Sequence, residues 1–216
     1  MDKLQYRHMN RFITIAACLA MAACTSQKPA QLVDRMTHDP NYTNTEIILH
    51  VWSWDFNTIA ENMKQIADAG YTMLQTSPVN ACFSPEGGNV KILDEKEGNW
   101  YHYYQPTDWT IGNNILGTEE EMQVMLDSAK KYDIRVLVDV LPNHTAFNID
   151  LVTDEFYAAV GGREKMFHSC GLEGIHDYSD RTQCTLQGVG GLPDVNTENP
   201  LFQKYYMQFV NKLIEM

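Results

Sequence analysis

Two short segments carry side chains of the kinds that bind sugars, metal ions or reacting groups. Residues 139–144, with the sequence DVLPNH, place a carboxylate (Asp139), a carboxamide (Asn143) and an imidazole (His144) close together. Residues 191–196, with the sequence GLPDVN, contain Asp194, whose carboxylate suits a hard cation. Local chemistry leaves a simpler interpretation open for both segments, in which Asn, Pro and Asp only shape turns at the end of a strand and before a helix.

Aromatic residues cluster just before the first of these segments. The cluster comprises Trp100, Tyr101, Tyr103, Tyr104 and Trp109. Such residues can pack in a core or form a wall on which a neutral sugar ring stacks, and the sequence leaves both interpretations open.

The elements that must position these residues follow from hydrophobic periodicity. Strand patterns occupy 47–52, 72–76 and 134–141, and helix patterns occupy 58–69, a segment from Thr118 to about 129, and a segment from Asn199 onward. Thr118 with Glu121 predicts a capping box, and Asn199 followed by Pro200 predicts an N-cap. Residues 79–114 read as one long loop, which we expect to serve a site.

Alternation of strands and helices predicts an α/β fold with a parallel sheet. The pattern permits a doubly wound sheet or a (β/α)8 barrel. The continuous apolar run at 134–141 is typical of a parallel strand buried on both faces. Residues 139–144 would then lie at the carboxyl end of that strand, where active-site groups collect in such folds.

Composition and the N-terminus bear on location and partners. The formal net charge of −12 argues against a nucleic-acid partner. Lys3, Arg7 and Arg11 precede an apolar run at 12–23, which is too short to span a bilayer and fits a signal peptide. Its end, Met-Ala-Ala-Cys at 21–24, resembles a bacterial lipobox. Cys18 is a second candidate, and an ordinary signal peptide with an incidental cysteine is the alternative.

These features divide the N-terminus into a lipoprotein signal peptide (1–23), the lipidation site Cys24 and a polar tether (24–45). We therefore expect an exported bacterial lipoprotein, anchored through lipid at the cell surface or outer membrane. Export permits disulfides, and Cys170 and Cys184 could pair and leave Cys82 free, although spacing does not fix geometry.

Taken together with Tyr-Gln-Pro at 104–106, the motifs DVLPNH and GLPDVN resemble the α-amylase family, glycoside hydrolase family thirteen. The resemblance runs from about residue 46 to 216. It implies the N-terminal part of a (β/α)8 TIM barrel, about three of eight strands. Residues 46–144 would begin the barrel, 145–190 would form the inserted domain B, and 191–216 would return to the barrel with its third helix.

The resemblance also implies roles for single residues. Asn143 and Asp194 correspond to ligands of a structural calcium ion. Tyr104, His144 and, less directly, Gln105 correspond to residues that contact the substrate sugar, and Asp139 to a residue that supports the site. Leu192 before Pro193 leans toward α-1,4-glucans such as starch and maltooligosaccharides.

Members of this family are retaining glycosidases that use a pair of carboxyl groups. By resemblance, the nucleophile, the acid/base and a third carboxylate follow strands four, five and seven and fall beyond Met216. We therefore expect the 216-residue chain alone to lack glycosidase activity, and its open strand edges to favour aggregation. The alternatives are a non-catalytic glucan-binding surface lipoprotein, or another family member such as a transglycosylase or oligo-α-glucosidase.

Overall fold

The structure, a computed structural model, describes residues 46–83 and 100–216. The assignments of a signal peptide (1–23), a lipidation site at Cys24 and a tether (24–45) lie outside the described residues. Within the described ranges, no helix has the length and apolar character needed to cross a bilayer.

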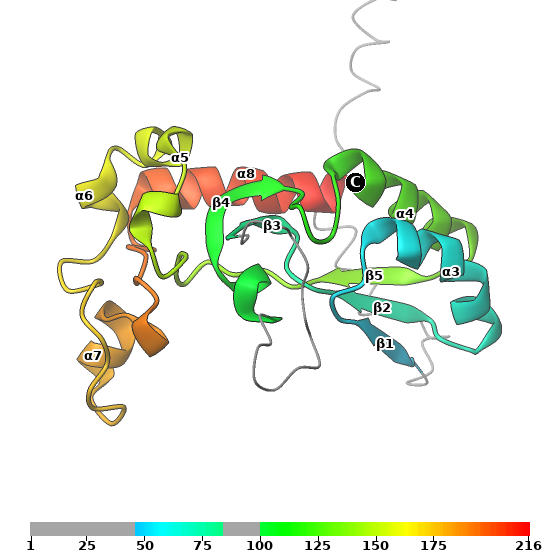
Figure 1. Ribbon diagram of the computed structural model, residues 1–216, viewed down its shortest axis with the longest axis horizontal. Helices are drawn as coiled ribbons and strands as arrows, with labels where there is room; N and C mark the ends of the chain where they lie inside the picture. Colours follow the sequence, from blue (N-terminus) through cyan, green and yellow to red (C-terminus); the bar gives the residue numbers. More distant parts are fainter. Residues whose placement is uncertain (1–45, 84–99) are drawn as a thin grey trace, which may run out of the picture. The chain divides into compact units, whose positions relative to one another are not determined.

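A three-stranded parallel sheet organises the first part of the fold (Figure 1). Its strands, in spatial order, are β1 (Ile48–Val51), β2 (Met73–Thr76) and β5 (Arg135–Val138). Val51 pairs with Thr76, and Thr76 pairs with Val138. The carboxyl ends of all three strands therefore reach the same edge of the sheet. The predicted parallel sheet is confirmed, with each strand shorter than its apolar run.

Two long helices cover one face of this sheet and contact each other (Figure 1). The first, α3 (Phe56–Asp68), begins where the Asp55 carboxylate accepts the backbone N–H of Thr58 at 2.8 Å. Its buried residues recur at helical spacing, which keeps one face on the sheet. The helix ends before Gly70, whose φ of +89° suits glycine.

The second helix, α4 (Glu119–Lys131), has the predicted capping box. The Thr118 hydroxyl accepts the N–H of Glu121, and the Glu121 carboxylate accepts the N–H of Thr118. Three glutamates occupy the first turn and two lysines the last, which complements the helix dipole at both ends. The sequence therefore fixes both the start and the charge polarity of this helix.

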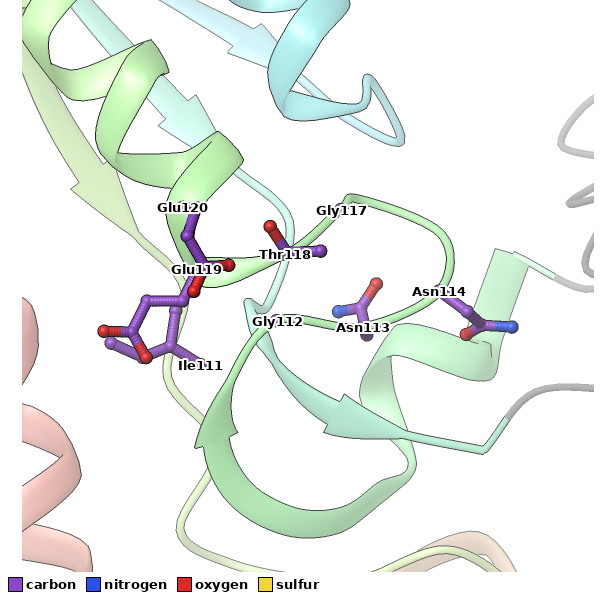
Figure 2. A pocket seen from close by; sticks show the side chains of 8 residues that line it. All are labelled: Ile111, Gly112, Asn113, Asn114, Gly117, Thr118, Glu119 and Glu120. Atoms are coloured by element: carbon purple, nitrogen blue, oxygen red, sulfur yellow. The ribbon is translucent and has the colours of Figure 1, made fainter.

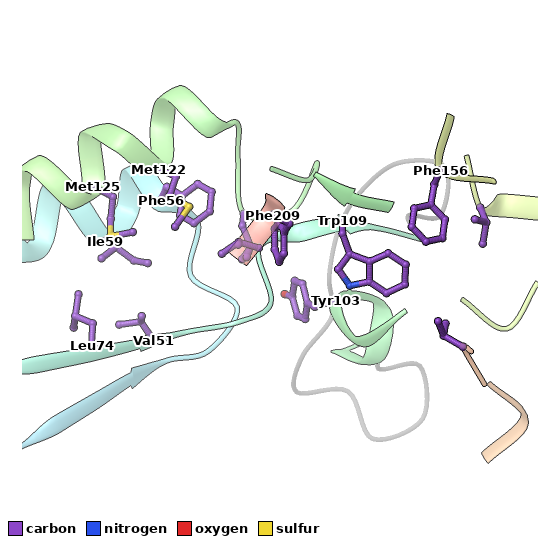
Figure 3. Packing of buried hydrophobic residues seen from close by; sticks show 14 of the residues in the cluster. Val51, Phe56, Ile59, Leu74, Tyr103, Trp109, Met122, Met125, Phe156 and Phe209 are labelled. Atoms are coloured by element: carbon purple, nitrogen blue, oxygen red, sulfur yellow. The ribbon is translucent and has the colours of Figure 1, made fainter. Parts of the chain in front are cut away.

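The buried apolar residues form one cluster with two recognisable parts (Figure 3). Aliphatic and sulfur-containing side chains fill the space between the helices and the sheet: Val51, Ile59, Met63, Leu74, Met122 and Met125. Aromatic side chains dominate the other part, where the Trp109 ring lies 4.8 Å from Phe156 and 5.2 Å from Phe202, centroid to centroid. This second part joins the segment before α4 to later regions of the chain.

The prediction of one continuous loop at 79–114 is wrong for the described residues 79–83 and 100–114. This stretch contains β3 (Asn80–Cys82), the 3-10 helix η1 (Trp100–Tyr104) and β4 (Pro106–Ile111). β3 and β4 pair antiparallel, with Asn80 opposite Ile111 and Cys82 opposite Pro106. Neither strand contains a long apolar run that would mark it as a strand in the sequence. Their pairing depends instead on contacts between residues that lie far apart in the chain. The aromatic cluster divides accordingly, because Tyr103 and Trp109 are buried whereas Tyr101 is 42% exposed.

Short elements make up the predicted insertion 145–190. They are η2 (Ile149–Leu151), α5 (Asp154–Ala159), α6 (Arg163–Met166), α7 (Arg181–Leu186) and η3 (Val189–Gly191). The longer helix α8 (Pro200–Glu215) follows, with Asn199 as its N-cap as predicted. The Asn199 side chain also donates to the carbonyl oxygens of Val160 and Lys165, at 3.0 and 3.1 Å. It thereby ties the start of α8 to the insertion.

A buried carboxylate joins three segments of the chain. Asp108, in β4, is 5% exposed. One of its oxygens accepts the Thr153 hydroxyl at 2.6 Å, and the other accepts the Tyr205 hydroxyl at 2.7 Å. Thr153 caps α5 and Tyr205 lies in α8, so one side chain connects β4, the insertion and the last helix.

Two further expectations need correction. The strand predicted at 134–141 is not buried on both faces, because the side chain of Leu137 in β5 is 42% exposed. β5 is also an edge strand of the described sheet, since it pairs only with β2. The disulfide considered between Cys170 and Cys184 is not formed. The Cys170 thiol instead donates to the carbonyl oxygen of Leu186, and the Cys184 thiol to that of Tyr178.

Candidate functional site

The candidate site lies at the edge of the sheet where the three parallel strands end. β5 ends at Val138, and the segment 139–144 begins directly after it. Ser53 and Ser77 follow the ends of β1 and β2, and the backbone N–H of Ser53 donates to the Ser77 hydroxyl at 2.9 Å. The polar residues of 139–144 therefore follow β5 at the same edge of the sheet as the ends of β1 and β2, which a hydrogen bond joins.

Three of the predicted site residues form one hydrogen-bonded group. The Tyr104 hydroxyl donates to Oδ2 of Asp139 at 3.2 Å. Nε2 of His144 lies 2.9 Å from the backbone oxygen of Tyr104. A carbonyl oxygen can only accept, so Nε2 of His144 carries the proton in this arrangement. The structure therefore brings Tyr104, Asp139 and His144 together, although they come from two separate segments.

Burial sets the protonation states within this group. Desolvation lowers the pKa of His144, and the bond to the Tyr104 carbonyl opposes that shift only in part. The imidazole is therefore held neutral. Burial, followed by the charge of Asp139, raises the pKa of the Tyr104 hydroxyl to about 12. Tyr104 consequently remains a hydrogen-bond donor throughout the physiological range.

Gln105 belongs to the same segment but faces inward. It is 7% exposed, and its Oε1 accepts the backbone N–H of Phe147 at 3.3 Å. This side chain therefore holds the start of the insertion in place. Its geometry differs from that of a carboxamide directed toward solvent and a substrate.

The two predicted metal ligands lie on neighbouring backbone segments. His144 and Asp194 form an antiparallel bridge, and the N–H of Val195 donates to the carbonyl of Asn143 at 2.9 Å. Asp194 is 4% exposed, and its Oδ2 lies 2.6 Å from Nδ1 of His168. Burial raises the pKa of Asp194, while His168 and His144 oppose the shift.

The residues present fit a calcium ion only in part. Calcium takes six to eight oxygen ligands. Asn143 can supply the oxygen of its carboxamide, and Asp194 supplies a carboxylate, one oxygen of which already lies 2.6 Å from Nδ1 of His168. Among the described residues, no group of three or more acidic, histidine or cysteine side chains gathers to hold a metal. Backbone oxygens and water would have to complete the coordination.

Two hollows lie elsewhere in the described fold. One, of about 470 Å³, lies where the loop 112–118 enters α4 (Figure 2). Its polar side chains already stabilise the fold, because the Asn113 carboxamide bonds four backbone groups. The other, of about 540 Å³, lies in the insertion beside Phe167 and His168. Neither includes Tyr104, Asp139 or His144.

Comparison with known proteins identifies the family. Residues 37–165 match the model of the α-amylase catalytic domain. The chain is 46% identical over 167 residues to an α-amylase of Butyrivibrio fibrisolvens, an alignment that covers 77% of this chain and 17% of that protein. It is 32% identical over 179 residues to an α-amylase of Clostridium acetobutylicum, covering 82% of this chain and 22% of that one. The chain belongs to the α-amylase catalytic-domain family.

Solved structures of α-amylases share the fold. α-Amylase I of Eisenia fetida matches with a TM-score of 0.62 and 22% identity, over 78% of this chain and 35% of that one. The α-amylase of Geobacillus thermoleovorans, solved with acarbose, matches with a TM-score of 0.62 and 22% identity, over 79% and 37%. The parallel sheet with α3 and α4 is thus part of an amylase α/β barrel. The chain spans about a fifth of the length of the two bacterial relatives.

Sequence reasoning missed the structural positions of two residues in the segments around the candidate site. Phe147 is 54% exposed, three positions after His144, and Gln105 anchors its backbone. Asp108 lies two positions after Pro106 and connects β4 to the insertion. An apolar residue in a polar loop and an acidic residue in a short strand were the available signals. Neither indicates its partners, which lie far away in the sequence.

Proposed function

We propose that this chain is part of an α-amylase-type glycoside hydrolase that cleaves α-1,4-glucosidic bonds in starch or maltooligosaccharides with retention of configuration. The observation that carries the proposal is the hydrogen-bonded group of Tyr104, Asp139 and His144 at the carboxyl end of β5, in a chain of the amylase family. In this proposal the Tyr104 ring stacks on a sugar, and the neutral imidazole of His144 holds the backbone of Tyr104 through its carbonyl oxygen.

The relatives are consistent with a glucan ligand. The Geobacillus enzyme was solved with acarbose, and a variant of the Eisenia enzyme with maltohexaose. A cyclomaltodextrin glucanotransferase also shares the fold, with a TM-score of 0.56, so transglycosylation is the neighbouring reaction to test. Product analysis separates the two reactions, because a transglycosylase returns chains longer than its substrate.

Hydrolysis with retention needs two carboxyl groups about 5 Å apart, one as nucleophile and one as acid/base. In the loops 139–144 and 191–196 the carboxylates are Asp139 and Asp194, and each is already engaged, with Tyr104 and His168 respectively. The 216-residue chain alone is therefore proposed to bind glucan without hydrolysing it. Reducing-end release from amylose by the purified chain, lost in Asp139→Asn, would contradict this.

Binding to maltoheptaose tests the site itself. Tyr104→Ala should abolish binding measured by ligand-observed NMR, because it removes both the ring and the bond to Asp139. Tyr178→Ala is the matched control, since Tyr178 is a 67% exposed tyrosine of the insertion. Equal binding by the wild type and Tyr104→Ala would overturn the assignment.

A non-catalytic glucan-binding protein would behave identically in that assay. Reading the gene past codon 216 separates the two. A frame that continues into further strands followed by Asp and Glu residues supports the hydrolase. A stop codon directly after Met216 in intact surroundings supports the binding protein.

Asn143 and Asp194 would hold a structural calcium ion between the barrel and the insertion. A ligand that binds only the folded state raises its stability. Millimolar calcium should therefore raise the Tm, and Asn143→Ala or Asp194→Asn should remove the rise. Asp127→Asn, an exposed position on α4, is the control. An equal rise in all four proteins would show that calcium acts elsewhere.

Export and lipid anchoring at Cys24 complete the proposal, and they rest on the sequence of the leader. Palmitate labelling of the protein in a bacterial host should disappear in Cys24→Ala and persist in Cys18→Ala. The reverse pattern would move the anchor to Cys18.

A further inference from the structure

Phe147 is an exposed aromatic side chain in the segment that follows His144. It lies three residues after His144, and 54% of its surface is exposed. A single exposed apolar residue is common on protein surfaces and by itself needs no functional explanation. What distinguishes Phe147 is the way in which its neighbours hold it.

Neighbouring side chains hold both its backbone and its ring. The Phe147 N–H donates to Oε1 of Gln105, whose side chain is 7% exposed. The Phe147 ring meets that of Phe83 edge to face, with centroids 5.5 Å apart. Phe83 in turn meets His102, 4.9 Å away and 3% exposed. The ring is thus ordered before any ligand arrives, which reduces the entropy cost of binding.

The anchoring residue also connects Phe147 to the candidate site. Gln105 follows Tyr104 directly, and Tyr104 contacts both Asp139 and His144. One short segment therefore sets the position of Tyr104 through its backbone and that of Phe147 through the next side chain. An apolar ring beside polar groups suits a pyranose, which has apolar C–H faces and hydroxyls at its rim.

We propose that Phe147 is a stacking platform for a glucose unit of the α-glucan chain that binds at Tyr104. This rests on the proposed function and extends it, by assigning a second aromatic contact and by making Gln105 the residue that positions it. In this arrangement Gln105 acts on the sugar through Phe147.

The test measures maltoheptaose binding by the 216-residue chain and four variants. Phe147→Ala should weaken binding about three- to tenfold, and Phe147→Leu should be nearly as weak because it keeps bulk but lacks a ring. Phe147→Trp should bind at least as tightly as the wild type. Tyr104→Ala marks the loss of the whole site. Since Phe147 is exposed, its variants should keep the Tm within about 2 °C.

Fluorescence gives a readout that a purely structural role would not change. In Phe147→Trp the added indole should change its emission when maltoheptaose is titrated, whereas the added indole of Tyr178→Trp should not. If Phe147→Ala and Phe147→Leu bind like the wild type while Tyr104→Ala does not, the platform is wrong and the proposed function stands. If neither the wild type nor Tyr104→Ala binds, both fail.

Discussion

Apolar side chains hold α3 and α4 on the parallel sheet, whereas both aromatic rings and buried polar side chains hold the insertion 145–190 against β4 and α8. The helices α3 and α4 have 13 residues each, long enough to present a continuous apolar face. In the insertion, α5 and α7 have six residues and α6 has four. Such short helices leave most of their backbone groups without intrahelical partners.

The insertion meets this need with side chains that reach outward. Asp108 accepts hydrogen bonds from Thr153 and Tyr205, and Asn199 donates to two carbonyl groups of the insertion. The comparison teaches that one region depends on the volume of its aliphatic core, whereas the other combines an aromatic core with a few buried polar contacts. Substitutions in the two regions should therefore destabilise the protein in different ways.

The largest effect is expected in the core of the first region. Ile59 is fully buried in α3, and Ile59→Ala should lower the free energy of unfolding by about 2 to 5 kcal/mol. Urea denaturation followed by circular dichroism measures the loss. Val124→Ala on α4 is the control, since Val124 is 56% exposed and should cost little. Equal losses would show that packing of α3 and α4 does not dominate this region.

The next effect belongs to the polar joint. Asp108→Ala leaves the hydroxyls of Thr153 and Tyr205 without their acceptor and should cost about 2 to 3 kcal/mol. Hydrogen exchange should rise mainly in α5 and α8. Asp108→Asn, which keeps the shape and one carbonyl acceptor, should cost less. Equal loss of protection in α3 and α4 would remove the distinction between the regions.

A smaller effect tests local stabilisation of a helix. Thr118→Ala removes one half of the capping box of α4 and should cost about 1 kcal/mol. Thr118→Ser keeps the hydroxyl and should remain close to the wild type in thermal unfolding. If the serine variant loses as much as the alanine variant, the threonine methyl group, and not the cap, supplies the stability.

The smallest effect is a dependence on alkaline pH at the site. The pKa of Tyr104 is raised to about 12, mainly by burial and then by Asp139, whereas an unfolded tyrosine titrates near 10. The folded chain keeps this proton while the unfolded chain releases it, so its stabilisation is complete below about pH 10 and is lost as pH rises toward 12. Tyr104→Phe should make this part of the stability profile less steep, and the exposed control Tyr178→Phe should not, while the other buried tyrosines keep part of the slope in both variants.

Local signals in the sequence predicted the long helices well. The capping box at Thr118, the apolar spacing of α3 and the Asn199-Pro200 start of α8 depend on neighbours within a few residues, and the structure has all three. The motifs DVLPNH and YQP also predicted that Tyr104, Asp139 and His144 belong together. The hydrogen bonds that join them are now visible.

The sequence could not predict contacts that depend on distant partners. The pairing of β3 with β4 joins residues that lie far apart in the sequence and lacks an apolar pattern, so hydrophobic periodicity did not predict it. The inward orientation of Gln105 depends on the backbone of Phe147, and the role of Asp108 depends on Thr153 and Tyr205. Each is an ordinary residue type whose function appears only after the chain has folded.

The reach of Asp108 across the chain has a consequence for the order of events during synthesis. Its partner Tyr205 lies 97 residues downstream. At a synthesis rate of about 5 to 20 residues per second, several seconds pass between the appearance of the two residues. Throughout that interval α3, β2 and α4 can assemble from neighbouring segments, while the carboxylate of Asp108 still lacks one of its donors. The insertion should therefore dock after α3, β2 and α4 have assembled, when α8 leaves the ribosome and supplies the missing hydroxyl.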